Sequence, residues 1–313
     1  GLVASMVHAI HQDRQGDIWL GTGMPAIHQG EGITRYDGKT FTSYTRADGL
    51  ADNNVYAIAE ADNGDLYFGT ANGLSRFDGE KFHNYTSKDG MLGQSVLAMA
   101  FDQQGQLWLG TELGANRFDG AKFEQFTSAD GLPLNTSTNY YPGAIFCVTT
   151  DSKGRVWFGS ISGGGAAYYD GEKFVRFTPQ NGLPGTRVSS ISEDRDGHIW
   201  FSLLGVGVAR YDGEKFKLFN SEDGLAGHTV MSLTVDGEGQ LWAPVFGGGL
   251  SRYDGAHFKH FTTEEGLVGN MSHALARDRI QLGLAAEPDP CSLEGLGARR
   301  CETGPHPSRH RMA

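Results

Sequence analysis

Hydrophobic and polar residues alternate along most of the chain in short runs that are separated by glycine and aspartate. Runs of this kind predict short β-strands joined by tight turns. A representative unit begins with the apolar run 55–59 and ends with the alternating run 82–86. Similar units recur at roughly forty residues, and such recurrence indicates an array whose units stack because none can bury its faces alone.

The stretch 16–22, Gly-Asp-Ile-Trp-Leu-Gly-Thr, is the most regular part of each unit. Its further copies begin at Gly64, Gly105, Gly154, Gly197 and Gly239. The aromatic residue stands three positions after the glycine, as Trp19, Tyr67, Trp108, Trp157, Trp200 and Trp242. We expect the five tryptophan rings to pack between neighbouring units, because their place in the repeat is fixed. A recurring arginine is expected to be a structural partner for nearby acids: Arg35, Arg76, Arg117, Arg210 and Arg252.

Turn signals divide each unit into four strands. Between the first and second strands, Asp and Gly stand at the first and fourth positions of a turn, as in 102–105, which suits a type I turn. Between the third and fourth strands, Asp-Gly pairs are hairpin signals, as at Asp78-Gly79. Four strands joined by short turns form an antiparallel meander, and radial repetition of meanders is a β-propeller, so we predict an all-β fold.

The repeat predicts six complete four-stranded blades and one extra strand. The blades span residues 3–46, 53–88, 94–129, 143–180, 186–222 and 228–264, with a partial seventh at 270–278. Gly1 and Leu2 match the end of an earlier connector, so we expect a fragment of a seven-bladed parent. Residues 279–313 contain no Phe, Tyr, Trp or Lys and carry four prolines, which predicts a disordered tail.

Composition narrows the classes of partner. The chain of 313 residues has a formal net charge of −11 and a pI near 5.4, which argues against a nucleic-acid partner. No apolar run approaches the length of a membrane span, and no signal segment is visible. Three cysteines form neither a disulfide framework nor a zinc site, so no metal or cofactor is expected. Residues 62–65 lack the loop and distal Glu of an EF-hand, and we interpret them as a turn.

The changes in length all fall at one end of the predicted blades. In an antiparallel meander, the connector entering the first strand and the loop between the second and third strands lie at the same end. The long loop after Thr22, the insertion between Leu132 and Ala144, and the expansion at Gly163–Gly165 all belong there. Variable loops on a fixed scaffold usually carry binding. This face, around the mouth of the central channel, is therefore the candidate site.

Seven residues break the repeat and map to that face: His28, Asn135, Tyr140, Tyr141, Arg187, His228 and Phe246. Aromatic rings beside Asn, Arg and His suit a polyhydroxylated ligand, which stacks on a ring and hydrogen-bonds through its hydroxyls. We predict these residues as ligand-binding, and we predict no catalytic residue. The alternative is that they only pack the insertions against the next blade.

The combined motifs resemble the two-component regulator propeller repeat. They are Gly-x-(Ile/Leu/Val)-aromatic-(Leu/Phe)-Gly-Thr, Gly-(Leu/Ile)-x-Arg-(Tyr/Phe)-Asp-Gly-x-x-Phe and Asp-Gly-Leu, and the resemblance covers residues 1–278. It implies the periplasmic or extracellular sensor part of a membrane-bound, dimeric hybrid histidine kinase, often one that senses glycans. It also implies a small-molecule or glycan ligand, with any kinase outside these residues.

Two other functions stay open. The same repeat occurs in proteins without a kinase, which allows a non-catalytic scaffold for protein interaction. The chain also resembles streptogramin lyases, propeller enzymes whose blades carry a similar Gly-x-Leu-Trp-Phe stretch. A lyase needs a general base and a charge stabiliser that converge at the channel, and only His228 and Arg187 hold corresponding positions. We therefore expect no enzyme activity in these residues.

Overall fold

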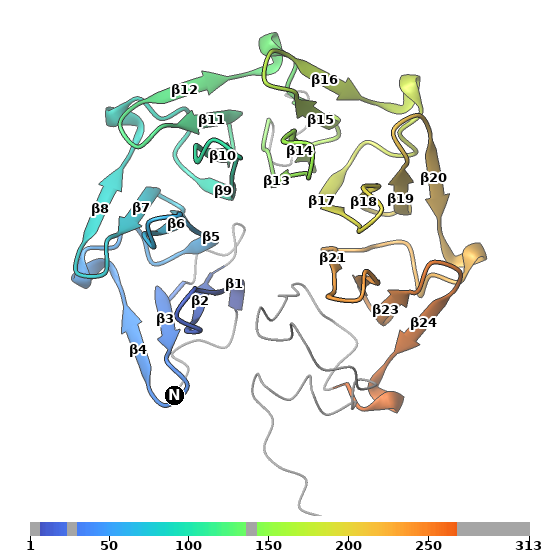
Figure 1. The fold of residues 1–313 in the computed structure, drawn as a ribbon, viewed down its shortest axis with the longest axis horizontal. Helices are drawn as coiled ribbons and strands as arrows, with labels where there is room; N and C mark the ends of the chain where they lie inside the picture. The colour runs from blue at the N-terminus through green and yellow to red at the C-terminus, as the bar shows by residue number, and fades with distance from the viewer. Residues whose placement is uncertain (1–6, 24–29, 136–142, 268–313) are drawn as a thin grey trace, which may run out of the picture. The chain divides into compact units, whose positions relative to one another are not determined.

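The computed structural model describes residues 7–23, 30–135 and 143–267, and these form six antiparallel sheets of four strands each. Within every sheet the strands pair in chain order, so each sheet is a meander. The inner strands lie side by side in the order β1, β5, β9, β13, β17 and β21, which arranges the blades in a ring (Figure 1). The predicted all-β propeller with six complete blades is confirmed. The predicted strand at 270–278 and the tail at 279–313 lie outside the described residues.

The first three blades run from β1 to β12. Blade one contains β1 (Val7–Gln12), β2 (Ile18–Thr22), β3 (Ile33–Tyr36) and β4 (Phe41–Tyr44). Blade two contains β5 (Val55–Glu60), β6 (Leu66–Thr70), β7 (Gly73–Phe77) and β8 (Phe82–Tyr85). Blade three contains β9 (Val96–Phe101), β10 (Leu107–Thr111), β11 (Ala115–Phe118) and β12 (Phe123–Phe126).

The last three blades run from β13 to β24. Blade four contains β13 (Cys147–Thr150), β14 (Val156–Ser160), β15 (Gly165–Tyr169) and β16 (Phe174–Phe177). Blade five contains β17 (Val188–Glu193), β18 (Ile199–Leu203), β19 (Gly207–Tyr211) and β20 (Phe216–Phe219). Blade six contains β21 (Thr234–Val235), β22 (Leu241–Val245), β23 (Gly249–Tyr253) and β24 (Phe258–Phe261).

A single-turn 3₁₀ helix follows the outer strand of every blade: η1 (Arg46–Asp48), η2 (Ser87–Asp89), η3 (Ser128–Asp130), η4 (Pro179–Asn181), η5 (Ser221–Asp223) and η6 (Thr263–Glu265). These turns explain the recurring Asp-Gly-Leu motif. In η1, Thr45 and Asp48 form a capping box, and Gly49 ends the turn at a φ of 103°, which favours glycine. Leu50 then points into the core with 3 % exposure.

The recurring tryptophans form the packing layer between blades, as predicted. Trp19, Trp108, Trp157 and Trp200 are at most 2 % exposed. Each ring contacts an aromatic ring of the next blade; Trp108, for example, lies 5.4 Å from Phe158, and Trp157 lies 5.5 Å from Phe201. Trp242 in the last blade differs, because it is only half-buried and its ring contact within the described residues is Phe261 of its own blade.

The second glycine of the repeated stretch is required by close approach of the next blade. A Cβ added at Gly110 would lie 2.7 Å from Cγ2 of Ile145, which stands two residues before the inner strand of blade four. Gly21, Gly69 and Gly159 face Val55, Val96 and Val188 in the same way. Blade five has Ser202 at this position, and blade six has Pro244.

The recurring arginines have two kinds of partner. Arg35 and Arg76 donate through Nε to Asp17 at 2.6 Å and Asp65 at 2.7 Å, as predicted. Arg117 pairs with Glu124 on the neighbouring strand. Arg210 and Arg252 have no carboxylate partner in the described part of the chain and lie over the rings of Trp200 and Trp242 instead.

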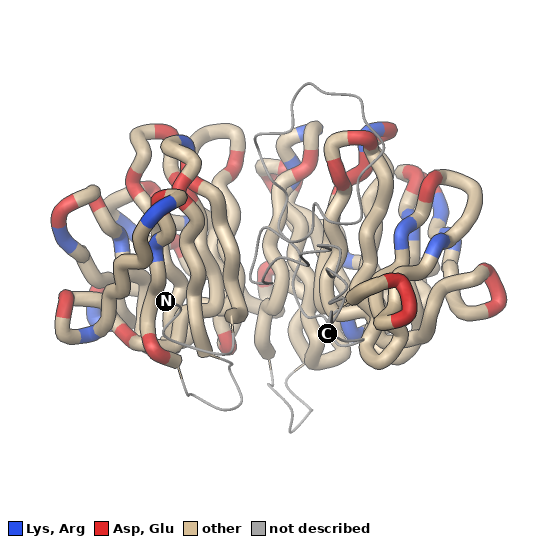
Figure 2. Tube along the Cα trace, turned by 90° about the horizontal axis from the view of Figure 1, so that it is seen from below, with Lys and Arg blue, Asp and Glu red and all other residues tan. Residues whose placement is uncertain are grey.

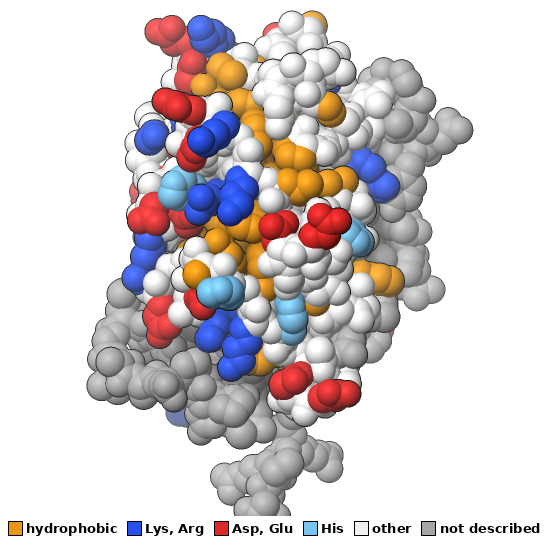
Figure 3. Space-filling model, turned by 90° about the vertical axis from the view of Figure 1, so that its right-hand side faces the viewer, with side chains coloured by type: hydrophobic (Ala, Val, Ile, Leu, Met, Phe, Trp, Pro, Cys, Tyr) orange, Lys and Arg blue, Asp and Glu red, His pale blue; other side chains and the backbone are white. Residues whose placement is uncertain are grey.

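Charged residues lie mainly at the turns and on the outer strands, as the edge view shows (Figure 2). On the side of the ring that carries β20, acidic, basic and hydrophobic side chains are interspersed (Figure 3). This mixed surface gives a nucleic acid no continuous basic patch on that side. No helix in the described part of the chain has the length and apolar character needed to cross a membrane.

Candidate functional site

The two ends of the ring differ in what they carry. We call one end the connector face; it holds the connectors between blades and the loops that join the second and third strands, such as 71–72, 161–164 and 246–248. The opposite end is the hairpin face, which holds the turns between first and second and between third and fourth strands. On the connector face, loops and connectors are tied by backbone hydrogen bonds, as from Gly73 N to Gln94 O at 2.8 Å.

Two predicted site residues meet at one loop of blade four. Arg187 donates through Nε to the carbonyl of Ile161 at 3.1 Å. In the same loop, a Cβ at Gly163 would lie 3.4 Å from Nδ2 of Asn135 and 3.8 Å from Oγ1 of Thr186. Asn135 and Arg187 therefore both lie against the loop 161–164, which they reach from successive connectors.

Two further predicted residues meet at blade six. The backbone N–H of Phe246 donates to the carbonyl of Thr229 at 2.8 Å, which places its loop beside the connector that carries His228. His228 is exposed, and its Nε2 lies 3.3 Å from Oγ of Ser221. Phe246 is 52 % exposed, as are Phe41 and Leu113 to similar degrees among the described residues.

The remaining predicted residues, His28, Tyr140 and Tyr141, lie outside the described residues. The structure therefore places Asn135 and Arg187 against one loop of blade four, and the backbone of Phe246 against the connector of His228, at two places on one face. No hydrogen bond or ion pair between the described residues joins the first pair to the second.

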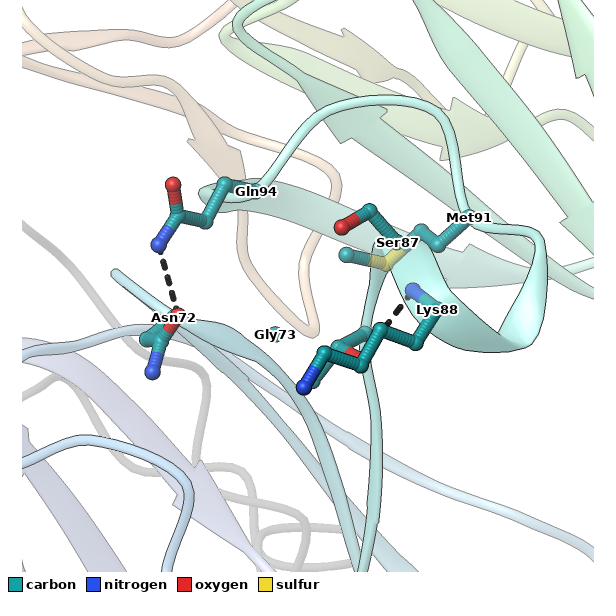
Figure 4. Close-up of a pocket in the computed structure, with 7 residues that line it drawn as sticks. Asn72, Gly73, Ser87, Lys88, Met91 and Gln94 are labelled. Atoms are coloured by element: carbon teal, nitrogen blue, oxygen red, sulfur yellow. Dashed lines mark hydrogen bonds between the residues drawn. The ribbon is translucent and has the colours of Figure 1, made fainter.

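A hollow of about 300 Å³ opens on the connector face between blades two and three. It is lined by Asn72, Gly73, Thr86, Ser87, Lys88, Met91 and Gln94 (Figure 4). Nε2 of Gln94 donates to Oδ1 of Asn72 at 2.6 Å across one side, and the exposed Lys88 lies on the other. Met91, which is 2 % exposed, supplies an apolar floor. Amides, hydroxyls and one ammonium around an apolar floor suit a small polar ligand.

None of the seven predicted residues lines this hollow. Sequence reasoning missed it because it looked for changes in length, whereas segments 70–73 and 86–94 have the ordinary length. One signal was available. Lys88 is the only basic residue at its place in the repeat, where the other blades have Ala47, Ala129, Gln180, Glu222 and Glu264.

A second hollow, of about 370 Å³, lies on the hairpin face between blades three and four. Its lining includes Asp102, Gln104, Gln106, Arg117 and Tyr169. The charged side chains of this lining already have partners in the protein. Asp102 accepts a hydrogen bond from Trp108 Nε1 at 2.8 Å, and Arg117 forms an ion pair with Glu124. This hollow is the outer end of a tryptophan layer.

Lowered carboxyl pKa values recur on the hairpin face. Backbone amides of Thr40 and Lys39 lower the pKa of the Asp37 carboxyl to about 2. The amides of Lys81 and Glu80 hold the pKa of Asp78 still lower. The corresponding hairpin amides also lower the pKa of Asp119, Asp170, Asp212 and Asp254. Since the same shift recurs in every blade, it reflects hairpin structure and marks no reactive site.

One group on the hairpin face has the residue types of a cation site: Asp194, Asp196 and His198. Its central carboxylate is already occupied, because Asp194 accepts from the amides of Asp196 at 3.0 Å and His198 at 2.9 Å, and from Trp200 Nε1 at 2.7 Å. The 62–65 turn is likewise engaged, since Asp65 accepts from Arg76 and Asp62 from Arg14. In both places the acidic side chains stabilise a turn.

The two residues weighed for catalysis have different hydrogen-bond partners. Arg187 is directed to the carbonyl of Ile161 in blade four, whereas His228 lies beside Ser221 after the outer strand of blade five. A base and a charge stabiliser for one substrate must meet within hydrogen-bond reach of it. Burial raises the pKa of the Cys147 thiol to about 12, so this thiol is protonated at neutral pH and is a poor nucleophile.

These features define a repeat propeller with a variable connector face and a uniform hairpin face. The model of the two component regulator propeller family matches residues 1–24, 49–72, 90–112 and 182–204. These four segments thus match the two-component regulator propeller repeat, and the resemblance seen in the motifs is confirmed. A comparison with curated protein sequences finds no match.

Solved structures share the propeller fold. A virginiamycin B lyase from Staphylococcus aureus, crystallised with quinupristin in a catalytically inactive form, is 17% identical with a TM-score of 0.64, covering 82% of this chain and 84% of that one. PorZ, a surface component of the type-IX secretion system of Porphyromonas gingivalis, is 16% identical with a TM-score of 0.65, covering 87% and 44%. The extracellular domain of a putative hybrid two component system from B. thetaiotaomicron is 19% identical with a TM-score of 0.36, covering 84% and 46%. At these identities the likeness extends to the fold alone.

Proposed function

We propose that this propeller is a ligand-binding module, the periplasmic or extracellular sensor part of a two-component signalling protein. Its ligand is a small polar molecule or a glycan, bound on the connector face. The observation that supports this proposal most is that the changes in loop length, the residues Asn135 and Arg187 at one loop, and the polar hollow beside Lys88 share one face. The family match supports the signalling role.

The chemistry of the hollow favours a ligand with several hydrogen-bonding groups. Asn72 and Gln94 bond each other through one amide group each and have further amide donors and acceptors. Ser87 offers a hydroxyl and Lys88 an exposed ammonium, whereas the Thr86 hydroxyl is engaged with Asp89 and the Lys88 N–H. A hollow of about 300 Å³ is at the small end of the range for ligand sites, so a compact molecule fits better than a long chain.

The test is a screen of the full chain against libraries of glycans and small polar metabolites, by thermal shift and then calorimetry. We expect a compound that raises Tm increasingly with its free concentration L, following RT ln(1 + L/Kd), and that is recovered unchanged. The proposal fails if no compound binds, or if binding is unaffected by both Lys88→Ala and Arg187→Ala. Lys122→Ala is the matched control, because Lys122 is an exposed lysine on the hairpin face.

The same screen distinguishes the sensor proposal from the lyase alternative. A cyclic depsipeptide substrate that is converted to a ring-opened product, with loss of turnover in His228→Ala, would replace the sensor proposal by an enzyme. Binding without turnover that is weakened by a connector-face variant supports the sensor proposal.

A further inference from the structure

The third and fourth strands of blades five and six carry pairs of like charge. Arg210 in β19 lies directly opposite Lys217 in β20, and Arg252 in β23 lies directly opposite Lys259 in β24. Each residue of the second pair follows its counterpart in the first by 42 residues. Side chains that face each other across antiparallel strands are about 5 Å apart at Cβ, and like charges there destabilise the sheet. Both blades therefore hold an unfavourable pair at the same place.

The other blades avoid this repulsion at the same register position. Arg117 of blade three lies opposite Glu124 and forms an ion pair with it. A charged residue on an edge strand discourages edge-to-edge pairing, and Glu124 shows that an acid can stand here as well as a lysine. The remaining blades have an uncharged residue or a histidine in the fourth strand, in the pairs Arg35–Thr42, Arg76–His83 and Tyr168–Val175.

Blades five and six also lack the acid that binds the arginine from the second strand. In blade two, Arg76 donates to Asp65, the residue after the first glycine of the repeated stretch. This position holds His198 in blade five and Gln240 in blade six. Nε of Arg252 is a buried donor without a hydrogen-bond partner among the described residues, although buried donors are normally paired. Both places from which a carboxylate reaches the arginine are thus without an acid.

Aromatic rings lie beneath these cations instead. Nζ of Lys217 is 4.6 Å from the centroid of the Phe219 ring, and Nζ of Lys259 is 5.1 Å from that of Phe261. Cζ of Arg252 is 5.7 Å from the same Phe261 ring. A ring face attracts a cation but leaves its N–H donors available for other acceptors. Each pair therefore presents an ammonium and a guanidinium without a carboxylate in the described part of the chain.

We propose that each pair binds one carboxylate or sulfate group of an acidic oligosaccharide, which crosses blades five and six along the outer rim formed by the fourth strands. An ammonium and a guanidinium from directly opposite positions can contact one anionic group together. Hydrogen bonds between two charged groups are short and strong. The bound anion also removes the repulsion within each pair. This rim site is separate from the connector face.

The surroundings favour a saccharide over other polyanions. The outer strand β20 spans only four residues, and acids stand close to both of its ends, Asp212 and Glu214 before it and Glu222 and Asp223 after it. An acidic peptide added as a further strand would meet these acids, whereas a chain that crosses the strands passes from one cation pair to the next. Basic side chains on this side of the ring lie in separate groups (Figure 3), which does not suit the dense charge of a nucleic acid.

Calorimetry of the full chain at low salt tests the proposal with three probes: an oligogalacturonate, a sulfated oligosaccharide and a neutral cello-oligosaccharide. We expect at least one acidic probe to bind and the neutral probe not to bind. Lys217→Glu should weaken binding about tenfold, and Lys217→Glu combined with Lys259→Glu should remove it. Lys122→Glu is the matched control, because it makes the same charge change at an exposed lysine of the hairpin face, and it should bind as the unaltered chain does.

Three results would overturn the rim site. They are the absence of binding by both acidic probes, unchanged binding in the double variant, and tighter binding of a polyglutamate peptide than of either saccharide. Lys88→Ala and Arg187→Ala should leave this binding unchanged, so the outcome is independent of the ligand proposed for the connector face. Weaker binding in those two variants would place the saccharide on the connector face and also overturn the rim site.

Urea unfolding without saccharide gives a second measurement. Lys217→Glu places an acid opposite Arg210, as in blade three, so it should raise the urea midpoint. Glu124→Lys creates a like-charge pair opposite Arg117 and should lower the midpoint. A midpoint that is unchanged or lower in Lys217→Glu would show that the pair in blade five is not repulsive, and would contradict a pair retained for binding an anion.

Discussion

Nε1 of Trp157 donates a hydrogen bond of 2.7 Å to Oδ2 of Asp151, and this contact links the turn of a blade to its packing layer. The other carboxylate oxygen of Asp151 accepts the turn amides of Lys153 and Arg155. Four other blades repeat the aspartate–tryptophan pair, and blade two lacks both partners because it has Ala61 and Tyr67. One carboxylate thus fixes the turn and orients the ring that meets the next blade.

A double-mutant cycle between these residues should detect their coupling. Combining Asp151→Ala with Trp157→Phe, we expect a coupling free energy of about 1.5–3 kcal/mol in urea unfolding, since the bond involves a charged acceptor. The control cycle pairs Trp157→Phe with Asp236→Ala in blade six, which should be additive within about 0.5 kcal/mol. Equal coupling in both cycles would contradict a direct bond.

Removing a ring from the packing layer should destabilise the propeller strongly. Trp108 is 1 % exposed and contacts Phe126 of its own blade and Phe158 and Tyr169 of the next. We expect Trp108→Ala to lower the free energy of unfolding by about 3–5 kcal/mol. Trp242→Ala is the matched comparison and should cost less, because Trp242 is only half-buried. A loss below about 1 kcal/mol at Trp108 would show that the layer does not hold the blades.

The hairpin aspartates should make the fold sensitive to acid. Their folded pKa lies below the unfolded value, so their contribution is present above the unfolded pKa and is lost as pH falls through the folded pKa. With an unfolded value of about 3.9 and Asp37 at about 2, the urea midpoint should fall between about pH 4 and about pH 2. Asp78→Asn should flatten this fall.

Added salt tests whether backbone amides or screened charge interactions cause this acid sensitivity. The leading causes of the shifts are backbone amides of the hairpin, so added salt should leave the fall with pH largely unchanged. A urea midpoint that stays constant from pH 6 to pH 2, or a fall that 1 M salt removes, would argue for another origin.

The sequence predicted the fold because each local signal agrees with the repeat. The Asp-Gly pairs became hairpins, and the tryptophan stretches became second strands. It did not predict the bond from Trp157 to Asp151, because the turn already accounted for that aspartate. It also did not predict the hollow beside Lys88, since a hollow depends on how Asn72 and Gln94 approach from different segments.

The site residues were predicted from departures from the repeat. Such departures indicate which face is variable, but they do not show which residues contact a ligand. Arg187 departs from the repeat, yet its guanidinium is directed to the Ile161 carbonyl of blade four. Departure from a pattern can thus serve either binding or the packing of an altered loop. Only the distances in three dimensions distinguish the two roles.

The most direct test of the account is the dissociation constant of one screened ligand for the unaltered chain, for Lys88→Ala, for Arg187→Ala and for Lys122→Ala. We expect Lys122→Ala to bind as the unaltered chain does, and at least one connector-face variant to bind about tenfold or more weakly, which corresponds to about 1.4 kcal/mol. Weaker binding in Lys122→Ala with both connector-face variants unchanged would place the ligand on the hairpin face and contradict the account.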